Sequence, residues 1–420
     1  MSATPTLIHI LTANRWGGIQ RYALDICREF KEAGWDVYAI TKGAKAVDDL
    51  FEREGISLLY APFEGMLDFQ SIRLLKQKIE KCEGRVVVHA HGFRKVFTAL
   101  AARKLSKKGD VRVVVTRHKV KRGNDSWLFR EIYNHIDAIV FVSRLARDKF
   151  IETWKGRELP FPAGKMHVLH NSIKMEETVA GAEERQEPRD KIQEQCRDVP
   201  QVHPPQRGSK NDEPSDKSHG PGLEISENRS AKKNRGPVTA MFHGPLESGK
   251  GLETLIDAMS LLKGKKIRLR IVGSGTPDYV DKIRRRAISR GVMDLIDWHK
   301  YTDNPLVLIS ESDFGVLPSL DAEAFGLSNI EYMSMGRPQV CSSNGAQTEY
   351  ITDGVEGILV PPGNAELLAA AIEELATDPE LRHRMGRKAY ETFRERLSWD
   401  RFVKGIGRIY GVGATEGGNS

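Results

Sequence analysis

The stretch that decides the fold is VLPSLDAEAFGLSNIE, residues 316–331. An apolar strand ends here at a Pro-Ser turn, and a glycine-containing loop then opens a helix. At the carboxyl end of a parallel strand, the free amides at the start of such a helix point into the crevice beside the sheet and form an anion site. The segment therefore predicts an α/β fold with an anion-binding loop.

Two carboxylates flank this anion site. Glu323 lies in the loop and Glu331 in the helix, with seven residues between them. A carboxylate repels a diphosphate, but it readily accepts hydrogen bonds from hydroxyl groups. We therefore interpret the pair as acceptors for the hydroxyl groups of a sugar and a ribose. The residues alone also allow a plainer interpretation, an exposed acidic loop followed by a helical glutamate.

The alternation of strand and helix continues in both directions from this segment. A chain of 420 residues is too long for one ordinary core, because a domain usually takes about 100–200 residues. We expect two Rossmann-like α/β domains facing across a cleft, over residues 1–174 and 237–410. The strands predicted for them are residues 7–12, 36–41, 86–90, 111–116, 138–142 and 166–169, then 238–242, 267–272, 314–317 and a strand from 339.

Residues 175–236 differ from both halves. They contain no Phe, Tyr or Trp, and Pro, Gln, Glu, Lys, Ser and Asn dominate. Such a composition cannot bury enough apolar surface to offset the conformational entropy of folding. We expect a disordered insert or linker there, and a flexible tail over residues 411–420.

The formal net charge of +7 is unevenly distributed. Residues 1–174 contain 31 Lys and Arg against 19 Asp and Glu, so this part carries about +12. We expect it to contact an anionic membrane or a phosphate-bearing acceptor peripherally, with a solvated basic surface as the plainer alternative. Nucleic acid is not expected as a partner, because the chain carries no recognisable nucleic-acid module.

Other classes are disfavoured by what the sequence contains. No apolar run reaches the roughly 18 residues of a membrane span, and the N-terminus has no basic leader followed by a long apolar run, which predicts a cytoplasmic protein. The four cysteines form no CxxC pair, so neither a zinc site nor a disulfide framework is suggested.

The segment 316–331 resembles the E-x7-E signature of glycosyltransferase family 4, whose members have the GT-B fold and retain the anomeric configuration of the transferred sugar. Other short pieces follow in the order of that family and cover nearly the whole chain outside residues 175–236. They are GG at 17–18, HAHG at 89–92, TRH at 116–118, VS at 142–143, HNSI at 170–173, HGPL at 243–246 with KG at 250–251, IVGSG at 271–275 and GRP at 336–338.

The resemblance implies a metal-independent transferase that takes a sugar from a UDP- or GDP-sugar. At the matching positions, Glu331 binds the ribose, Glu323 holds the donor sugar, Lys250 contacts the diphosphate and His118 faces the reacting sugar. The remaining donor-binding positions that it implies are Gly17, Gly18, Gly273, Phe325, Gly326 and Leu327. By the habit of the family, the acceptor is a glycan or a lipid-linked glycan of surface polysaccharide, lipopolysaccharide or glycolipid synthesis.

The sequence also departs from the family pattern. Pro245 stands where relatives carry a phosphate-binding arginine, and Lys119 and Lys174 stand where an aspartate is common. A missing arginine removes a bidentate donor that a neighbouring lysine cannot fully replace. Weak donor binding, an unusual donor or an inactive site are therefore open. The chain has no strict DxD motif, so no divalent metal is expected.

Two alternatives share this architecture. A nucleotide-sugar epimerase would bind the same donor without an acceptor, and a catalytically impaired GT-B protein would serve as a scaffold. A nicotinamide dehydrogenase fits less well, because Gly273-Ser274-Gly275 lacks the third glycine of the dinucleotide fingerprint.

Overall fold

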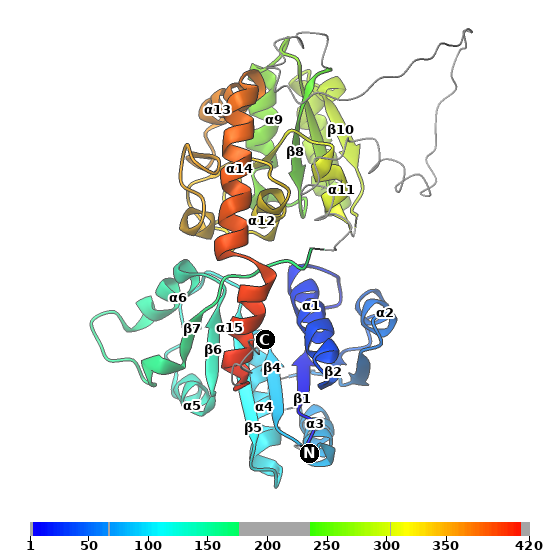
Figure 1. The fold of residues 1–420 in the computed structure, drawn as a ribbon, viewed down its shortest axis with the longest axis vertical. Coiled ribbons are helices and arrows are strands. Elements are labelled where there is room, and N and C mark those ends of the chain that lie inside the picture. The colour runs from blue at the N-terminus through cyan, green and yellow to red at the C-terminus, as the bar shows by residue number, and fades with distance from the viewer. Residues whose placement is uncertain (1–2, 66–67, 176–235, 303, 413–420) are drawn as a thin grey trace, which may run out of the picture. The chain divides into compact units, whose positions relative to one another are not determined.

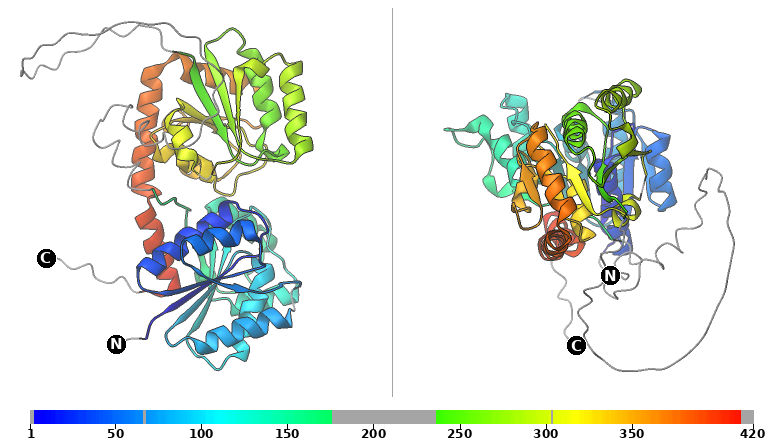
Figure 2. Two further views of the ribbon diagram at one scale, coloured as in Figure 1. Left: turned by 90° about the vertical axis from the view of Figure 1, so that its right-hand side faces the viewer. Right: turned by 90° about the horizontal axis from the view of Figure 1, so that it is seen from above.

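The computed structural model describes residues 3–65, 68–175, 236–302 and 304–412. They form two parallel sheets, one of seven strands and one of six, with helices packed on the faces (Figures 1 and 2). The first sheet has the order β3-β2-β1-β4-β5-β6-β7 and the second the order β10-β9-β8-β11-β12-β13. The expected pair of Rossmann-like sheets is therefore confirmed.

The first sheet is built from the strands β1 (Thr6–Ile10), β2 (Asp36–Thr41), β3 (Ser57–Tyr60), β4 (Val86–Ala90), β5 (Val111–Arg117), β6 (Ala138–Phe141) and β7 (Met166–Val168). Its helices are α1 (Gly18–Glu32), α2 (Lys45–Arg53), α3 (Phe69–Lys81), α4 (Phe93–Leu105), α5 (Trp127–His135) and α6 (Arg144–Ile151). The valines of β4 alternate between two cores: Val86 and Val88 pack with α3 and α4, and Val87 packs with α1. Because both faces are buried, the strand is apolar except at His89.

The second sheet consists of the strands β8 (Val238–His243), β9 (Ile267–Val272), β10 (Ile296–His299), β11 (Phe314–Leu317), β12 (Gln339–Ser342) and β13 (Ile358–Val360). Its helices are α9 (Leu252–Leu261), α10 (Pro277–Ser289), α11 (Pro305–Ser310), α12 (Leu327–Ser334), α13 (Ala365–Thr377) and α14 (Pro379–Arg396). The strands β9 and β11 begin and end as the sequence predicts.

The last helix, α15 (Trp399–Tyr410), differs from the expectation. The predicted boundary assigns it to the C-terminal half, but Phe402, Ile406 and Tyr410 pack into the core of the first sheet, together with Leu7 and Val114. Figure 1 shows α15 continuing from α14 and lying beside β4 and β5. The helical period shows that α15 has one apolar face, but it does not show which sheet that face covers.

Both sheets reverse their strand order at one point, between β1 and β4 in the first and between β8 and β11 in the second. In open α/β sheets, ligands bind outside the carboxyl ends of the strands at such a switch point. This rule points to the loops after β1, β4, β8 and β11, which carry the motifs GG, HAHG and HGPL and the segment 316–331.

The predicted insert and tail, residues 175–236 and 411–420, lie outside the described residues except at their edges. Among the helices that the structure does describe, none combines the length and the apolarity needed to cross a bilayer.

Candidate active site

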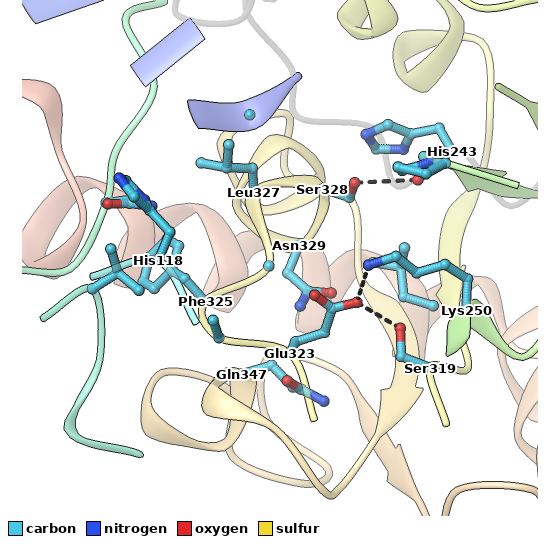
Figure 3. A pocket seen from close by; sticks show the side chains of 18 of the residues that line it. His118, His243, Lys250, Ser319, Glu323, Phe325, Leu327, Ser328, Asn329 and Gln347 are labelled. Atoms are coloured by element: carbon cyan, nitrogen blue, oxygen red, sulfur yellow. Dashed lines mark hydrogen bonds and ion pairs between the residues drawn. The ribbon is translucent and has the colours of Figure 1, made fainter. Parts of the chain in front are cut away.

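A pocket of about 330 Å³ lies at the carboxyl ends of the strands (Figure 3). The loops after β8 and β11 and the start of α12 form much of its lining. Gly18, His118 and Asn171 contribute to it from the first sheet. The fold thus brings together motifs that are separated by up to three hundred positions in the sequence.

Lys250 and Glu323 form an ion pair in this pocket, with 2.6 Å between Nζ and Oε1 (Figure 3). Ser319 donates a second hydrogen bond to the same oxygen at 2.7 Å. Lys250 is presented by a short turn that ends at Gly251, whose φ of +69° is left-handed. A Cβ atom at Gly251 would lie 1.9 Å from the carbonyl oxygen of Pro318, so glycine allows the two loops to approach each other.

The N-terminus of α12 supplies the neighbouring amides. Gly326 is the N-cap with a φ of +87°, and the first amides of a helix have no intrahelical acceptor. Phe325, Gly326 and Leu327 all line the pocket, as the sequence predicts for an anion site. These amides add a partial positive charge of about half an elementary charge to that of Lys250.

The loop before α12 is held by hydrogen bonds to its carbonyl groups. The buried Tyr350 hydroxyl donates to the carbonyl oxygen of Phe325 at 2.5 Å. From the first sheet, Ser143 Oγ donates to the carbonyl oxygen of Ala324 at 2.6 Å. With the carbonyls held in this way, the loop keeps one conformation in which its amides are available to a ligand.

A further carboxylate, that of Glu349, comes from the half of the chain that forms the second sheet. It caps a helix that packs on the first sheet. It accepts hydrogen bonds from the backbone amides of Arg144 and Leu145, at 2.9 and 2.7 Å, at the start of α6. His170 lies 2.9 Å from the same carboxylate. Sequence reasoning missed Glu349, because nothing in its local pattern distinguishes it from a surface glutamate.

His118 follows β5 and lines the pocket from the side of the first sheet. Its Nε2 is hydrogen-bonded to Nδ1 of His91 at 3.1 Å, and the Tyr22 ring meets it edge-on at a centroid distance of 5.0 Å. Burial lowers the pKa of His118 to about 3, so the ring is neutral near pH 7. It can therefore offer a ligand one donor or one acceptor, but no positive charge.

Glu331 is placed differently from the other predicted residues. It is only 4% exposed and is not among the residues that line the pocket. Arg21 donates to one carboxylate oxygen at 2.6 Å, and Nε2 of His243 lies 2.6 Å from the other. Burial alone would raise the pKa of Glu331, but His243 and Arg21 outweigh it and hold the pKa below its usual value.

If Glu331 is to bind a ribose, the ribose hydroxyls must displace Arg21 or share the carboxylate with it. Sequence reasoning did not identify Arg21 and His243 as the partners of this carboxylate, and His243 also lines the pocket. His243 belongs to a quoted motif, whereas Arg21 lies 310 positions from its partner and carries no signal of the contact.

The three predicted glycines other than Gly326 have distinct positions. Gly18 lines the pocket, and a Cβ there would lie 3.0 Å from a methyl group of Leu327. Gly17 is the N-cap of α1. Gly273 has a φ of +155° and lies against the loop after β8, where a Cβ would come within 2.0 Å of the carbonyl oxygen of Gly244. Gly273 therefore supports the loop and does not line the pocket.

Three amide side chains add hydrogen-bonding capacity to the lining. They are Asn171, Asn329 and Gln347, and each has a buried amide oxygen without a protein partner among the described residues. Buried polar atoms of this kind are usually satisfied in proteins, so they suit a polar ligand. Asn171 was recognised as part of a motif, but Asn329 and Gln347 were not singled out.

Comparison with known proteins agrees with this geometry. A family model described as "Glycosyltransferase Family 4" matches residues 16–177, and one described as "Glycosyl transferases group 1" matches residues 224–392. Together they cover most of the chain.

One curated relative is the O-antigen chain mannosyltransferase C of Escherichia coli, 28% identical over 173 residues, which are 40% of this chain and 45% of the relative. The first curated relatives are matched over less than half of their own length.

Solved structures are similar over nearly the whole chain. A glycosyltransferase from Rickettsia africae has a TM-score of 0.75 at 20% identity, covering 97% of this chain and 98% of its own. The Anabaena protein HepE in complex with UDP and glucose has a TM-score of 0.71 at 15% identity, covering 96% and 99%. With the two matching family models, the two parallel sheets and the pocket at their switch points, the chain belongs to glycosyltransferase family 4 and has the GT-B fold.

Proposed function

We propose that this protein transfers a sugar from a UDP- or GDP-sugar to a glycan or lipid-linked acceptor, with retention of configuration at the anomeric carbon. The observation that carries the proposal is the convergence of Lys250, Glu323 and the amides of α12 in a single pocket that His118 also lines. A cation and helix amides match a diphosphate, while a carboxylate and a neutral imidazole match the hydroxyl groups of a sugar.

In the proposed reaction the bond between the anomeric carbon and the diphosphate oxygen breaks, and a bond from that carbon to the acceptor oxygen forms. The proton of the acceptor hydroxyl passes to the departing phosphate oxygen. Lys250 and the amides of Phe325, Gly326 and Leu327 stabilise the charge that develops on the diphosphate. Glu323 and His118 orient the sugar, so catalysis consists of positioning and electrostatic stabilisation.

The proposed donor and acceptor draw support from the names of relatives. HepE was crystallised with UDP and glucose, and the Escherichia coli relative is named for O-antigen chain synthesis. We extend these substrate classes to this chain, and place it in surface polysaccharide, lipopolysaccharide or glycolipid synthesis.

We further propose that the N-terminal half contacts an anionic membrane peripherally. Its excess of basic residues is the first support. The second is Trp127 at the start of α5, which is 76% exposed and follows the basic residues Lys119, Lys121 and Arg122 closely in the sequence. Tryptophan is enriched at membrane interfaces, and basic residues are attracted to anionic lipid.

Nucleotide binding and donor turnover test the proposal. We expect UDP or GDP, but not ADP, to raise the thermal unfolding temperature, because a ligand selective for the folded state stabilises it. We also expect slow hydrolysis of the matching sugar nucleotide, lost in Glu323→Gln. Nucleotide binding with no turnover above that variant would instead support the impaired scaffold, which Pro245 in the pocket favours. Release of an epimerised sugar nucleotide without acceptor would support the epimerase.

A further inference from the structure

Four histidines lie together at the switch point of the first sheet. His9 is on β1, His89 is on β4, and His91 and His118 follow β4 and β5. Because β1, β4 and β5 are adjacent parallel strands, these positions meet: His9 is paired in register with His89, and His89 with Val114. His9 and His89 are fully buried, while His118 reaches the pocket.

Three of these rings form a hydrogen-bonded series, which we call the histidine chain: His9, His91 and His118. Nδ1 of His9 lies 2.9 Å from Nε2 of His91, and Nδ1 of His91 lies 3.1 Å from Nε2 of His118. His89 stacks against the chain but bonds elsewhere. Its Nδ1 lies 2.6 Å from the hydroxyl of Tyr410, and its Nε2 lies 2.7 Å from the hydroxyl of Thr116.

All rings of the histidine chain are neutral at pH 7. Burial lowers the pKa of both His9 and His118 to about 3 and holds that of His91 well below its usual value. A neutral imidazole has one N–H donor and one lone pair. Each link of the chain therefore uses one N–H, and all three N–H bonds must point the same way along it.

Only two arrangements satisfy this condition. In the first, Nε2–H of His118 donates to His91, His91 donates to His9, and His9 is left with a buried N–H on Nε2. In the second, Nδ1–H of His9 donates to His91, Nδ1–H of His91 donates to Nε2 of His118, and His118 carries its proton on Nδ1. The tautomer of His118 is thus tied to that of His9.

The environment of His9 distinguishes the two arrangements. Its Nε2 is buried and has no hydrogen-bond partner in the part of the chain that the structure describes. The first arrangement would leave an N–H group without an acceptor, whereas the second leaves only a lone pair without a donor. Among buried backbone groups, orphaned N–H donors are rarer than under-satisfied acceptors, and applying the same preference to the imidazole nitrogen favours the second arrangement.

We propose that His9 and His91 are positioning residues that fix His118 as its Nδ1–H tautomer, so that His118 offers the pocket a hydrogen-bond donor and not a general base. Nε2 of His118 is occupied by His91, so Nδ1 is the ring nitrogen left for a ligand. That this ligand is the donor sugar rests on the proposed function, whereas the tautomer itself does not.

A metal ion is the competing use of this cluster. His9, His89 and His91 have ligand atoms within 4.8 Å of one another, which is close enough to hold an ion. Both nitrogens of His89, however, already face hydroxyl groups at 2.6 and 2.7 Å. The 2.9 Å between His9 and His91 is also an ordinary hydrogen-bond length. Hydrogen bonding therefore accounts for the cluster without an ion.

Nitrogen NMR of the full chain labelled with ¹⁵N-histidine tests the proposal directly, because protonated and unprotonated ring nitrogens resonate far apart. The signals of His118 are identified by their loss in His118→Asn. We expect Nδ1 to carry the proton and Nε2 to be unprotonated in the wild type at pH 7. A proton on Nε2 of His118, or rapid exchange between both tautomers, would overturn the proposal.

His91→Phe keeps an aromatic ring but removes both hydrogen bonds of the histidine chain. His118 should then populate both of its neutral tautomers. A merely structural role for His91 would leave the tautomer unchanged, and that result would contradict us. The exposed His383 of α14 provides the matched control: His383→Asn should leave the cluster signals as they are. Thermal unfolding of each variant checks that it is folded.

Adding zinc, and separately adding a sugar nucleotide, distinguishes the remaining interpretations of the cluster. Zinc added to the wild type should not move the signals of His9, His89 and His91, and a stoichiometric shift reversed by a chelator would show a metal site in place of the chain. A sugar nucleotide that shifts the Nδ1–H signal of His118, where the nucleoside diphosphate alone does not, would support contact with the sugar. If no nucleotide shifts it while the tautomer holds, the proposed function fails and the histidine chain stands.

Discussion

Removing the ammonium group of Lys250 tests the assignment of the diphosphate site. Lys250→Met keeps most of the length of the side chain and deletes the charge. In the structure this ammonium is paired with Glu323 at 2.6 Å, and the two side chains are 24% and 22% exposed. A bound diphosphate would share or take over the ammonium, so binding exchanges one ionic contact for another of higher charge.

The size of the effect follows from this exchange. A hydrogen bond to a charged group contributes about 1.5–3 kcal/mol, which corresponds to a roughly 10- to 150-fold change in dissociation constant. Pairing with Glu323 offsets part of this, because a largely solvated pair is worth about 0.2–1 kcal/mol and this one is only partly buried. The difference is about 0.5–2.8 kcal/mol, so we expect the nucleoside diphosphate to bind Lys250→Met about 2- to 100-fold more weakly.

Calorimetric titration with the preferred nucleoside diphosphate and with its nucleoside measures the difference. Nucleoside binding should change little, because Lys250 lies at the phosphate side of the pocket in our assignment. Lys282→Met is the matched control, since Lys282 is 59% exposed, pairs with Glu253 and does not line the pocket. Equal diphosphate affinity in Lys250→Met and wild type would show that the phosphates bind elsewhere.

Three further predictions address stability and the membrane. Unfolding at acid pH should be promoted by His9 and His89, which are buried and neutral: their folded pKa lies below the unfolded value of about 6.5, so stability is lost as pH falls below that value. His9, with a folded pKa of about 3, should alone cost about 2 kcal/mol between pH 7 and 5, and urea unfolding with the same midpoint at both values would contradict this. The thermal unfolding temperature should fall further in Gly251→Ala than in Gly264→Ala. At Gly251 φ is +69° and a carbonyl oxygen lies 1.9 Å from the new Cβ, whereas at Gly264 φ is +79° and the space is open. Trp127→Ser should reduce flotation with anionic vesicles at low salt, and equal binding of the wild type to neutral vesicles would refute an electrostatic contact.

The local sequence was sufficient to predict features that depend on interactions between neighbouring residues. Alternating strands and helices predicted two parallel sheets, and the glycine loop before α12 predicted its free amides, because periodicity and turn chemistry depend on neighbouring residues. The short spacing from Glu323 to Glu331 likewise marked one loop and one helix. These features gave the fold class and a set of candidate residues, most of which line one pocket.

The tertiary structure decided which distant groups meet. It placed Arg21 against Glu331, so that a residue expected to be open to ribose has both carboxylate oxygens occupied by protein. It packed α15 on the first sheet, where its Tyr410 reaches His89. Contacts between residues 310 or 321 positions apart leave no trace in local periodicity.

The histidine chain shows the same division. The sequence displays His91 and His118 in recognisable motifs, and His9 as one polar residue in an apolar strand. Their order as hydrogen-bonded neighbours depends on β1 lying beside β4 and β4 beside β5, which is a property of the sheet. The direction of the histidine chain then follows from one buried nitrogen that has no partner among the described residues, since burial removes the water that would otherwise satisfy it.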